Sequence, residues 1–211
     1  MRHLAFAIFM LFSFLSVFQV KAQEPDPPYA EWISKLSVKQ DPLSKNYREV
    51  LHDVKALDSL NFCQAFSTLK SKANSDNPRL EIRMMTLEAR VQMEHMGMRD
   101  CQVYKDPLGL LNAALTMSYE LEDDLLTYAV YFDLVAYYTV NSKYGQGVLY
   151  GLLAKDLFEQ LGKDKAFPMA SILYNLSFNL YKSREYRPAI DAILKMIGPE
   201  KNNYLRSDDT L

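Results

Sequence analysis

Two stretches of the sequence repeat the same spacing of large and small residues, and Leu176 of the later stretch lies 42 residues after Leu134 of the earlier one. Weaker echoes of the pattern lie further upstream, around Tyr104 and Phe62. A fixed period of this length is typical of repeat proteins, whose units bury their apolar faces only by stacking on neighbours. Glycine contributes only 7 of 211 residues, which disfavours turn-rich sandwiches, barrels and Gly-rich phosphate folds.

Apolar residues recur at helical spacing from Pro42 onward, with few alternations of the kind that strands show. We expect eight helices, near 44–60, 62–74, 78–97, 107–121, 124–142, 145–162, 166–183 and 186–198. Three of the predicted starts place a capping residue before a proline at the first helical position. These pairs are Asp41-Pro42, Asn77-Pro78 and Asp106-Pro107. Gly97 and Gly162 follow amphipathic stretches and indicate helix ends.

The repeated pattern resembles that of the tetratricopeptide (TPR) family, with large, small and aromatic positions, a turn, and then Tyr, small, bulky and small positions. In the last two units these positions hold Leu134, Val135, Tyr138, Tyr144, Gly147, Gly151 and Ala154, and Leu176, Ser177, Leu180, Tyr186, Ala189, Ile193 and Met196. The resemblance spans residues 44–200 and is most complete over 125–198. It implies an all-α, right-handed α-solenoid of about four helix-turn-helix units. The period of this chain exceeds the family's usual ~34 residues, so a generic α-solenoid is the alternative.

The N-terminus has the pattern of a cleavable secretory signal. Arg2 and His3 precede an uncharged apolar run over 4–18, and Val20 and Ala22 supply the small residues that a signal peptidase reads. We expect a signal peptide over 1–22, a Pro-rich leader over 23–43, a TPR-like domain over 44–200 and a short tail over 201–211. Export to the periplasm is the expectation, with secretion or an uncleaved N-terminal anchor as alternatives. After cleavage no stretch is long and apolar enough to span a membrane.

Charge and motif content favour binding over catalysis. The formal net charge is −2 without a basic stripe, so we expect no nucleic-acid partner. Gly145-x-Gly147-x3-Gly151 superficially resembles a dinucleotide loop, but the preceding residues 132–140 read as a helix and not as the required strand. No metal-ligand spacing, nucleophile motif or Walker lysine appears, and we expect no cofactor. Cys63 and Cys101 are expected to be free, buried thiols, with a disulfide as the alternative in an oxidising compartment.

Four aromatic residues are candidates for a partner groove: Phe132, Tyr174, Phe178 and Tyr181. They lie on the first helices of their predicted units, on the face that lines the concave groove of TPR-like proteins. Aromatic side chains there can hold a peptide, and they can equally pack against the neighbouring unit.

The last predicted helix carries a broad apolar stripe, formed by Ala189, Ile190, Ile193, Leu194 and Ile197. The residues that follow are too few for an amphipathic cap of ordinary length. We therefore expect an exposed apolar patch at this end, available for self-association, for a partner or for further repeats.

These features predict a non-catalytic scaffold or sensory module of the bacterial cell envelope that binds a protein or peptide. A signal peptide followed by long TPR-like units also resembles the extracytoplasmic part of membrane-bound histidine kinases or helix-turn-helix transcriptional regulators. A truncated sensor of that kind is the alternative hypothesis. An enzyme with an unrecognised site is the third.

Overall fold

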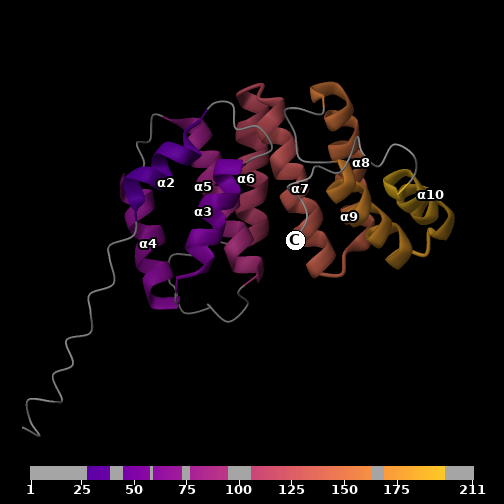
Figure 1. Cartoon of the computed structure of the whole chain (residues 1–211), viewed down its shortest axis with the longest axis horizontal. Helices are drawn as coiled ribbons and strands as arrows, with labels where there is room; N and C mark the ends of the chain where they lie inside the picture. Colours follow the sequence, from indigo (N-terminus) through magenta and orange to yellow (C-terminus); the bar gives the residue numbers. More distant parts are fainter. Residues whose placement is uncertain are drawn as a thin grey trace, which may run out of the picture.

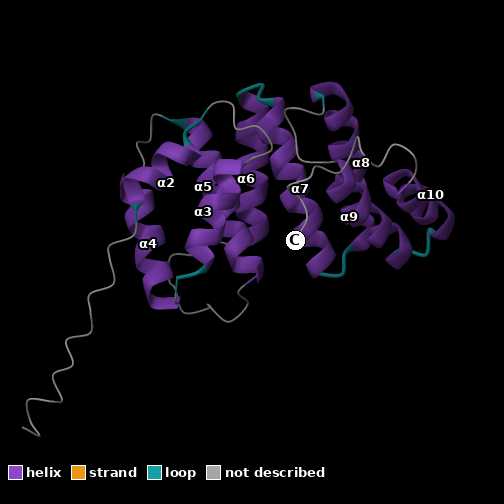
Figure 2. Ribbon diagram, in the orientation of Figure 1, coloured by secondary structure: helices purple, strands orange, loops and turns teal. Residues whose placement is uncertain are grey.

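The structure, a computed structural model, describes residues 28–38, 45–57, 59–72, 77–94, 106–162 and 169–197. Every regular element in these ranges is an α-helix (Figure 2). They are α2 (Tyr29–Leu36), α3 (Lys45–Lys55), α4 (Ser59–Lys72), α5 (Pro78–Glu94), α6 (Pro107–Glu120), α7 (Asp124–Val140), α8 (Tyr144–Leu161), α9 (Met169–Lys182) and α10 (Tyr186–Ile197). The predicted all-α fold is confirmed. The expected signal peptide and C-terminal tail lie outside the described residues.

The capping chemistry expected from the sequence is present wherever the structure describes it. The Asn77 side chain accepts a hydrogen bond from the Leu80 N–H at 3.1 Å, and the Asp106 carboxylate accepts one from the Gly109 N–H at 3.2 Å. Gly162 follows α8 with a positive φ of 86°, which suits a residue without a Cβ. Asp41 and Gly97 lie outside the described residues. Local signals of this kind fix where α5, α6 and α8 begin or end.

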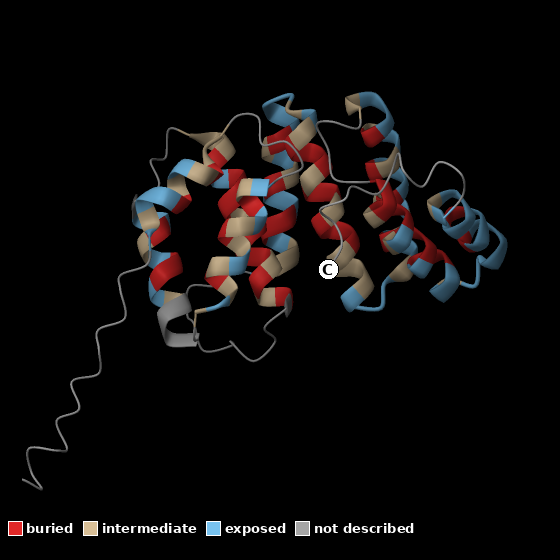
Figure 3. Ribbon diagram, in the orientation of Figure 1, coloured by how far each residue is buried: buried red, intermediate tan, exposed pale blue. Residues whose placement is uncertain are grey.

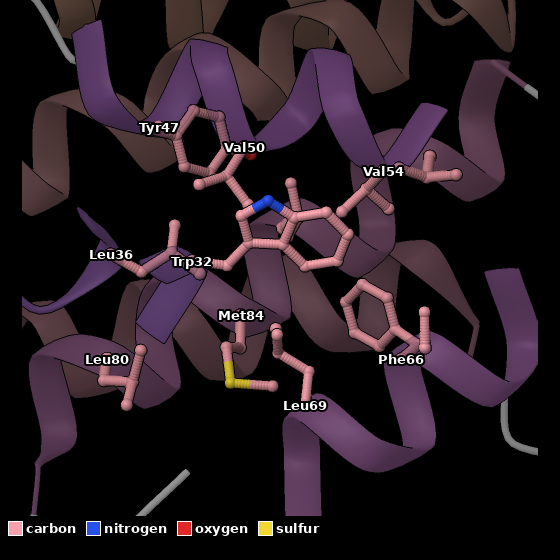
Figure 4. Close-up of a cluster of buried hydrophobic side chains, with 12 residues drawn as sticks. Trp32, Leu36, Tyr47, Val50, Val54, Phe66, Leu69, Leu80 and Met84 are labelled. Carbon is pink, nitrogen blue, oxygen red and sulfur yellow. The ribbon is translucent and has the colours of Figure 1, made fainter. Parts of the chain in front are cut away.

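Helix α2 was not expected from the sequence, which predicted only a Pro-rich leader over 23–43. It starts directly after Pro28, a position where proline is compatible with a helix. Trp32 and Leu36, one turn apart, are buried in a core shared with α3, α4 and α5 (Figure 4). The Trp32 indole N–H also donates to the Asp53 carboxylate at 3.2 Å. Because an eight-residue helix is not stable alone, this burial is what stabilises α2.

From α5 onward the helices stack in pairs. Helix α5 packs against α6, α7 against α8, and α9 against α10. The first helix of each later pair also contacts both helices of the pair before it: α7 packs on α5 and α6, and α9 packs on α7 and α8. Figure 1 shows these helices following one another along the long axis of the molecule in chain order. This arrangement is the stack of helical hairpins that the sequence period predicts.

The backbone repeats at the same 42-residue offset as the sequence. Ser142, between α7 and α8, and Arg184, between α9 and α10, both have positive φ, at 58° and 66°. In each turn a backbone N–H reaches back to the preceding helix: Lys143 N–H to the Tyr138 carbonyl at 2.8 Å, and Glu185 N–H to the Leu180 carbonyl at 2.9 Å. Both turns thus end the preceding helix with the same hydrogen bond. The turn between α6 and α7 uses it too, with Glu122 at a φ of 51° and the Asp123 N–H bonded to the Ser118 carbonyl at 3.1 Å.

Small residues on α8 let α9 approach closely. A Cβ on Gly147 would lie 2.6 Å from Cγ of Asn179, and a Cβ on Gly151 would lie 3.1 Å from Cδ1 of Leu176. Asn179 is fully buried, and its Nδ2 donates to Thr139 Oγ1 at 2.7 Å. The predicted close packing at both glycines is therefore confirmed. Since α7 covers residues 132–140, the segment before this glycine pattern is a helix, as expected.

We predict opposite effects for two alanine substitutions on α8. Gly147→Ala forces a methyl group into the Asn179 side chain, and we expect a loss of about 1–3 kcal/mol in the free energy of unfolding. Gly145→Ala is the matched control, since nothing lies within 4 Å of its Cβ, and helix propensity should raise stability by up to about 1 kcal/mol. Chemical denaturation measures both. Equal effects would contradict the packing described here.

Candidate functional site

An apolar groove lies between the last two described helices, α9 and α10, and we call it the end groove. Its volume is about 450 Å³, and it is lined by Tyr174, Ser177, Phe178, Tyr181, Tyr186, Ala189, Ile190, Ile193 and Met196. Ser177 is the one aliphatic hydroxyl in this lining, and its Oγ donates to the Tyr174 carbonyl of its own helix at 2.7 Å. The end groove therefore offers a partner mainly apolar and aromatic surface.

Large side chains around the end groove are exposed to solvent. The exposed fraction is 61% for Tyr174, 58% for Tyr181 and 55% for Ile190. The exposed, pale-blue side of α10 at the end of the array is visible in Figure 3. Leu194 and Ile197 extend the apolar surface along α10. The exposed patch predicted for this helix is thus present, except that Ala189, at the base of the end groove, is buried.

The aromatic rings of the end groove are held by one another. The Tyr181 and Tyr186 rings meet edge to face at a centroid distance of 5.7 Å, which joins α9 to the start of α10. The Phe178 ring contacts the Tyr144 ring of α8 in the same manner, at 6.3 Å. The Lys182 ammonium lies 5.4 Å from the Phe178 centroid, within range of a cation–π interaction. These contacts present a preformed aromatic wall.

Basic residues surround one end of the groove. Lys182, Arg184 and Arg187 are exposed at the turn between α9 and α10, where Glu185 is the only acidic residue. The turn therefore places a local excess of positive charge beside the apolar surface.

Three of the four predicted groove residues lie together. Tyr174, Phe178 and Tyr181 all line the end groove. Phe132 does not, although it occupies the position in α7 that Tyr174 occupies in α9, 42 residues later. Its ring is partly buried under the Arg90 guanidinium of α5, whose Cζ lies 5.6 Å from the ring centroid. The structure thus separates Phe132 from the other three.

Phe132 belongs to a smaller central cavity of about 170 Å³ where α3, α5 and α7 meet. Charged and polar side chains line it beside apolar ones, a feature that the sequence analysis missed: Tyr47, Arg48, Arg83, Thr86, Arg90 and Asp133. Arg90 pairs with Asp133 at 2.6 Å. Burial raises the pKa of the Tyr47 phenol, and the Asp133 carboxylate adds to the rise, so the phenol stays neutral near pH 7. These groups link α5 to α7 and to α3.

Most residues expected to pack between repeats are buried or half-buried. Buried ones are Leu134, Gly147, Gly151, Ala154, Leu176, Leu180 and Ala189, and half-buried ones are Tyr138 and Tyr144. Tyr186 and Ile193 are exposed instead. Their counterparts Tyr144 and Gly151 contact α9, whereas none of the described helices follows α10 to cover the later pair. Tyr186 packs on Tyr181 within its own unit, and packing of these two positions on a following unit stays a prediction.

The cysteine expectation also needs correction. Cys63 is disulfide-bonded, and none of the described cysteines is a free thiol. The sequence has one other cysteine, Cys101, which lies outside the described residues. Cys63 is only half-buried at the edge of the core formed by α2 to α5, so it is not enclosed as a small hydrophobic residue would be.

Neither a metal site nor a membrane span occurs in the described part of the chain. Its His, Cys, Asp and Glu side chains form no group of three or more that could hold a metal ion. None of its helices is long and apolar enough to cross a bilayer. Comparisons of the chain with models of protein families, with curated protein sequences and with solved structures find no match.

We predict that the end groove binds a hydrophobic dye such as anilinonaphthalene sulfonate. Ile190→Asp places a charge in the groove and should lower dye fluorescence by about half, since exposed apolar area drives the binding. Leu149→Asp on α8 is the matched control, because Leu149 is 53% exposed against 55% for Ile190 and does not line the groove. Equal losses of fluorescence in the two variants would show that the dye binds elsewhere.

Proposed function

We propose that this protein is a non-catalytic, TPR-like module of the bacterial cell envelope that binds a protein or peptide in the end groove. The observation that carries the proposal is the groove itself: an open surface of aromatic and aliphatic side chains on two adjacent helices. Exposed apolar side chains that gather in one groove with polar residues around it are typical of an interaction site. Aromatic residues with a polar rim are typical of protein interfaces.

The chemistry of the groove favours binding over catalysis. Its only aliphatic hydroxyl, on Ser177, is bonded to its own helix backbone. The lining also has the phenols of Tyr174, Tyr181 and Tyr186, but no carboxylate, histidine, lysine or thiol beside them. General acid–base and nucleophilic catalysis usually combine several such groups within hydrogen-bond reach of a substrate. The described surface instead supplies shape and apolar area.

Two independent features support export. The N-terminal sequence has the three-part pattern of a secretory signal, with Ala22 before the expected cleavage point. Cys63 is disulfide-bonded, and disulfides persist in oxidising compartments such as the periplasm. The right-handed superhelix that the TPR resemblance implies belongs to the same proposal.

The extracytoplasmic part of a sensor is the second candidate function. It is favoured by the 42-residue register, because the end groove lies where a further repeat would stack. In that case the natural ligand of the groove is another unit of the same signalling protein.

Site-specific photocrosslinking in cells tests the binding proposal. A benzophenone side chain introduced at Tyr174 or at Tyr181 should form an adduct with one and the same polypeptide, identified by mass spectrometry of the adduct. The same group at Leu149, exposed on α8 outside the groove, is the matched control and should form none. Ile190→Asp should abolish the adduct. Adducts that contain only two copies of this chain, or that are as abundant from position 149, would contradict the proposal.

Intact-mass analysis of the protein from the cell envelope, without reductant, tests the export proposal. We expect an N-terminus at Gln23 and no reaction of the denatured protein with iodoacetamide, because cleavage removes 1–22 and Cys63 is in a disulfide. A sample reduced first is the control and should react. An intact Met1 or a reactive thiol in the unreduced protein would place it elsewhere.

A further inference from the structure

We infer that the end groove binds one amphipathic α-helix of a partner protein, parallel to α9, in the way that α9 itself packs on α7 and α8. This inference rests on the proposed function and specifies the conformation of the bound segment. It follows from comparing the end groove with the internal contact one repeat earlier.

Helix α9 packs on α7 and α8 through one face. Leu176 lies against Gly151, and Asn179 lies against Gly147 and bonds to Thr139. Leu180, one residue further, belongs to the same buried cluster as Leu176. Positions 176, 179 and 180 have the spacing of a single helical face.

The surface that receives α9 has a copy at the end of the array. The receiving residues on α7 and α8 are Thr139, Gly147, Val148, Gly151 and Ala154. The residues 42 positions later are Tyr181, Ala189, Ile190, Ile193 and Met196, and all five line the end groove. The end groove is therefore the α9-binding surface of the next unit, without a described helix in it.

A helix suits this surface better than an extended peptide does. An extended segment leaves backbone N–H and C=O groups that need partners, and the backbones of α9 and α10 are already bonded within their helices. The Ser177 hydroxyl is also used within α9. A helix satisfies its own backbone and needs only apolar contact from the groove.

The charges at the rim set the direction of the bound helix. A helix parallel to α9 ends beside the turn that carries Lys182, Arg184 and Arg187. The carbonyl end of a helix carries partial negative charge, and basic side chains stabilise it. Acidic residues in the last turn of the partner helix would add to this attraction.

Side-chain size distinguishes the partner from a second copy of this chain. Where α8 has Gly147 and Gly151, α10 has Ala189 and Ile193. The incoming helix therefore needs small residues at the positions that correspond to Asn179 and Leu176. Two copies of the end groove face to face would bring large side chains against large side chains, so a second copy does not supply the small residues that an α9-type contact needs at these positions.

Two stapled peptides test the inference against the full chain. Both contain residues 169–182 with a hydrocarbon staple across 174 and 181, two turns apart, because both side chains line the end groove and are exposed to solvent. One keeps the natural sequence at the remaining positions, and the other carries Leu176→Ala and Asn179→Ala. We expect the small-residue peptide to bind about tenfold more tightly by fluorescence anisotropy, since overpacking penalises the larger side chains. An unstapled version with Leu173→Pro, which cannot form the helix, is the conformational control and should not bind.

Variants of the protein locate the binding and reverse the preference. Ile190→Asp should weaken binding about tenfold, whereas Leu149→Asp, equally exposed on α8, should leave it unchanged. Ile193→Gly recreates the environment of Gly151, so the peptide with its natural Leu176 should then bind at least as tightly as the small-residue peptide. Circular dichroism verifies that each variant is folded. A preference that Ile193→Gly does not alter, or equal binding of the proline peptide, would overturn the inference.

If another segment occupies the end groove, the binding and sedimentation experiments should give different results. Peptide binding that appears only after removal of residues 198–211 would assign the groove to the chain's own C-terminal segment. A dimer in sedimentation that excludes the peptide would assign it to a second copy. Both results would overturn this inference. A crosslinked partner that contacts the groove through a non-helical segment would leave the proposed function intact and refute only the helical occupant.

Discussion

The packing of α9 on α7 and α8 is the interaction on which the C-terminal half of the structure depends. Asn179 is fully buried between these helices, and its amide nitrogen bonds to Thr139 of α7 and to the Asn175 carbonyl of α9. The contact is possible because Gly147 has no side chain at the point where the carboxamide lies. The Asn179 amide nitrogen is paired twice, while its Oδ1 is buried with no hydrogen-bond partner among the described residues. The Gly147–Asn179 contact therefore positions the second hairpin on the first at the cost of one unpaired buried oxygen.

The N-terminal half joins its helices through charge as well as apolar packing. Arg79 of α5 forms an ion pair with Asp123, the capping residue of α7, and Arg90 pairs with Asp133 further along the same two helices. Such partly buried pairs favour one arrangement, because separating them leaves charges without partners. Trp32 adds an aromatic anchor from α2. The repeat pattern is clear only in the later units, because the earlier helices pack on one another through different residues, including ion pairs.

The sequence could predict what depends on local chemistry. The starts of α5 and α6 coincide with the predicted capping residues, and the 42-residue register placed Gly147 and Gly151 correctly at a helix contact. Helix α2 was missed because prolines dominate its flank and its signal is short, Trp32 and Leu36 one turn apart. Cys63 was misjudged because spacing along the chain does not show which cysteines meet in space.

The candidate site shows that the 42-residue register does not predict whether equivalent residues are covered or exposed. Phe132 and Tyr174 are equivalent in sequence, yet α5 covers one of them and the other faces solvent. A repeat pattern specifies which face of a helix meets the next unit. It does not specify which residues pack on that face, because those residues belong to another helix. At Gly151 the occupant is Leu176, whose side chain packs where a Cβ on Gly151 would lie 3.1 Å from its Cδ1. At Ile193 the surface carries a full side chain, so the helix that we propose for the end groove needs a smaller residue opposite it than Leu176. Differences in size at equivalent positions are thus the physical basis on which a stacking surface becomes a specific binding surface.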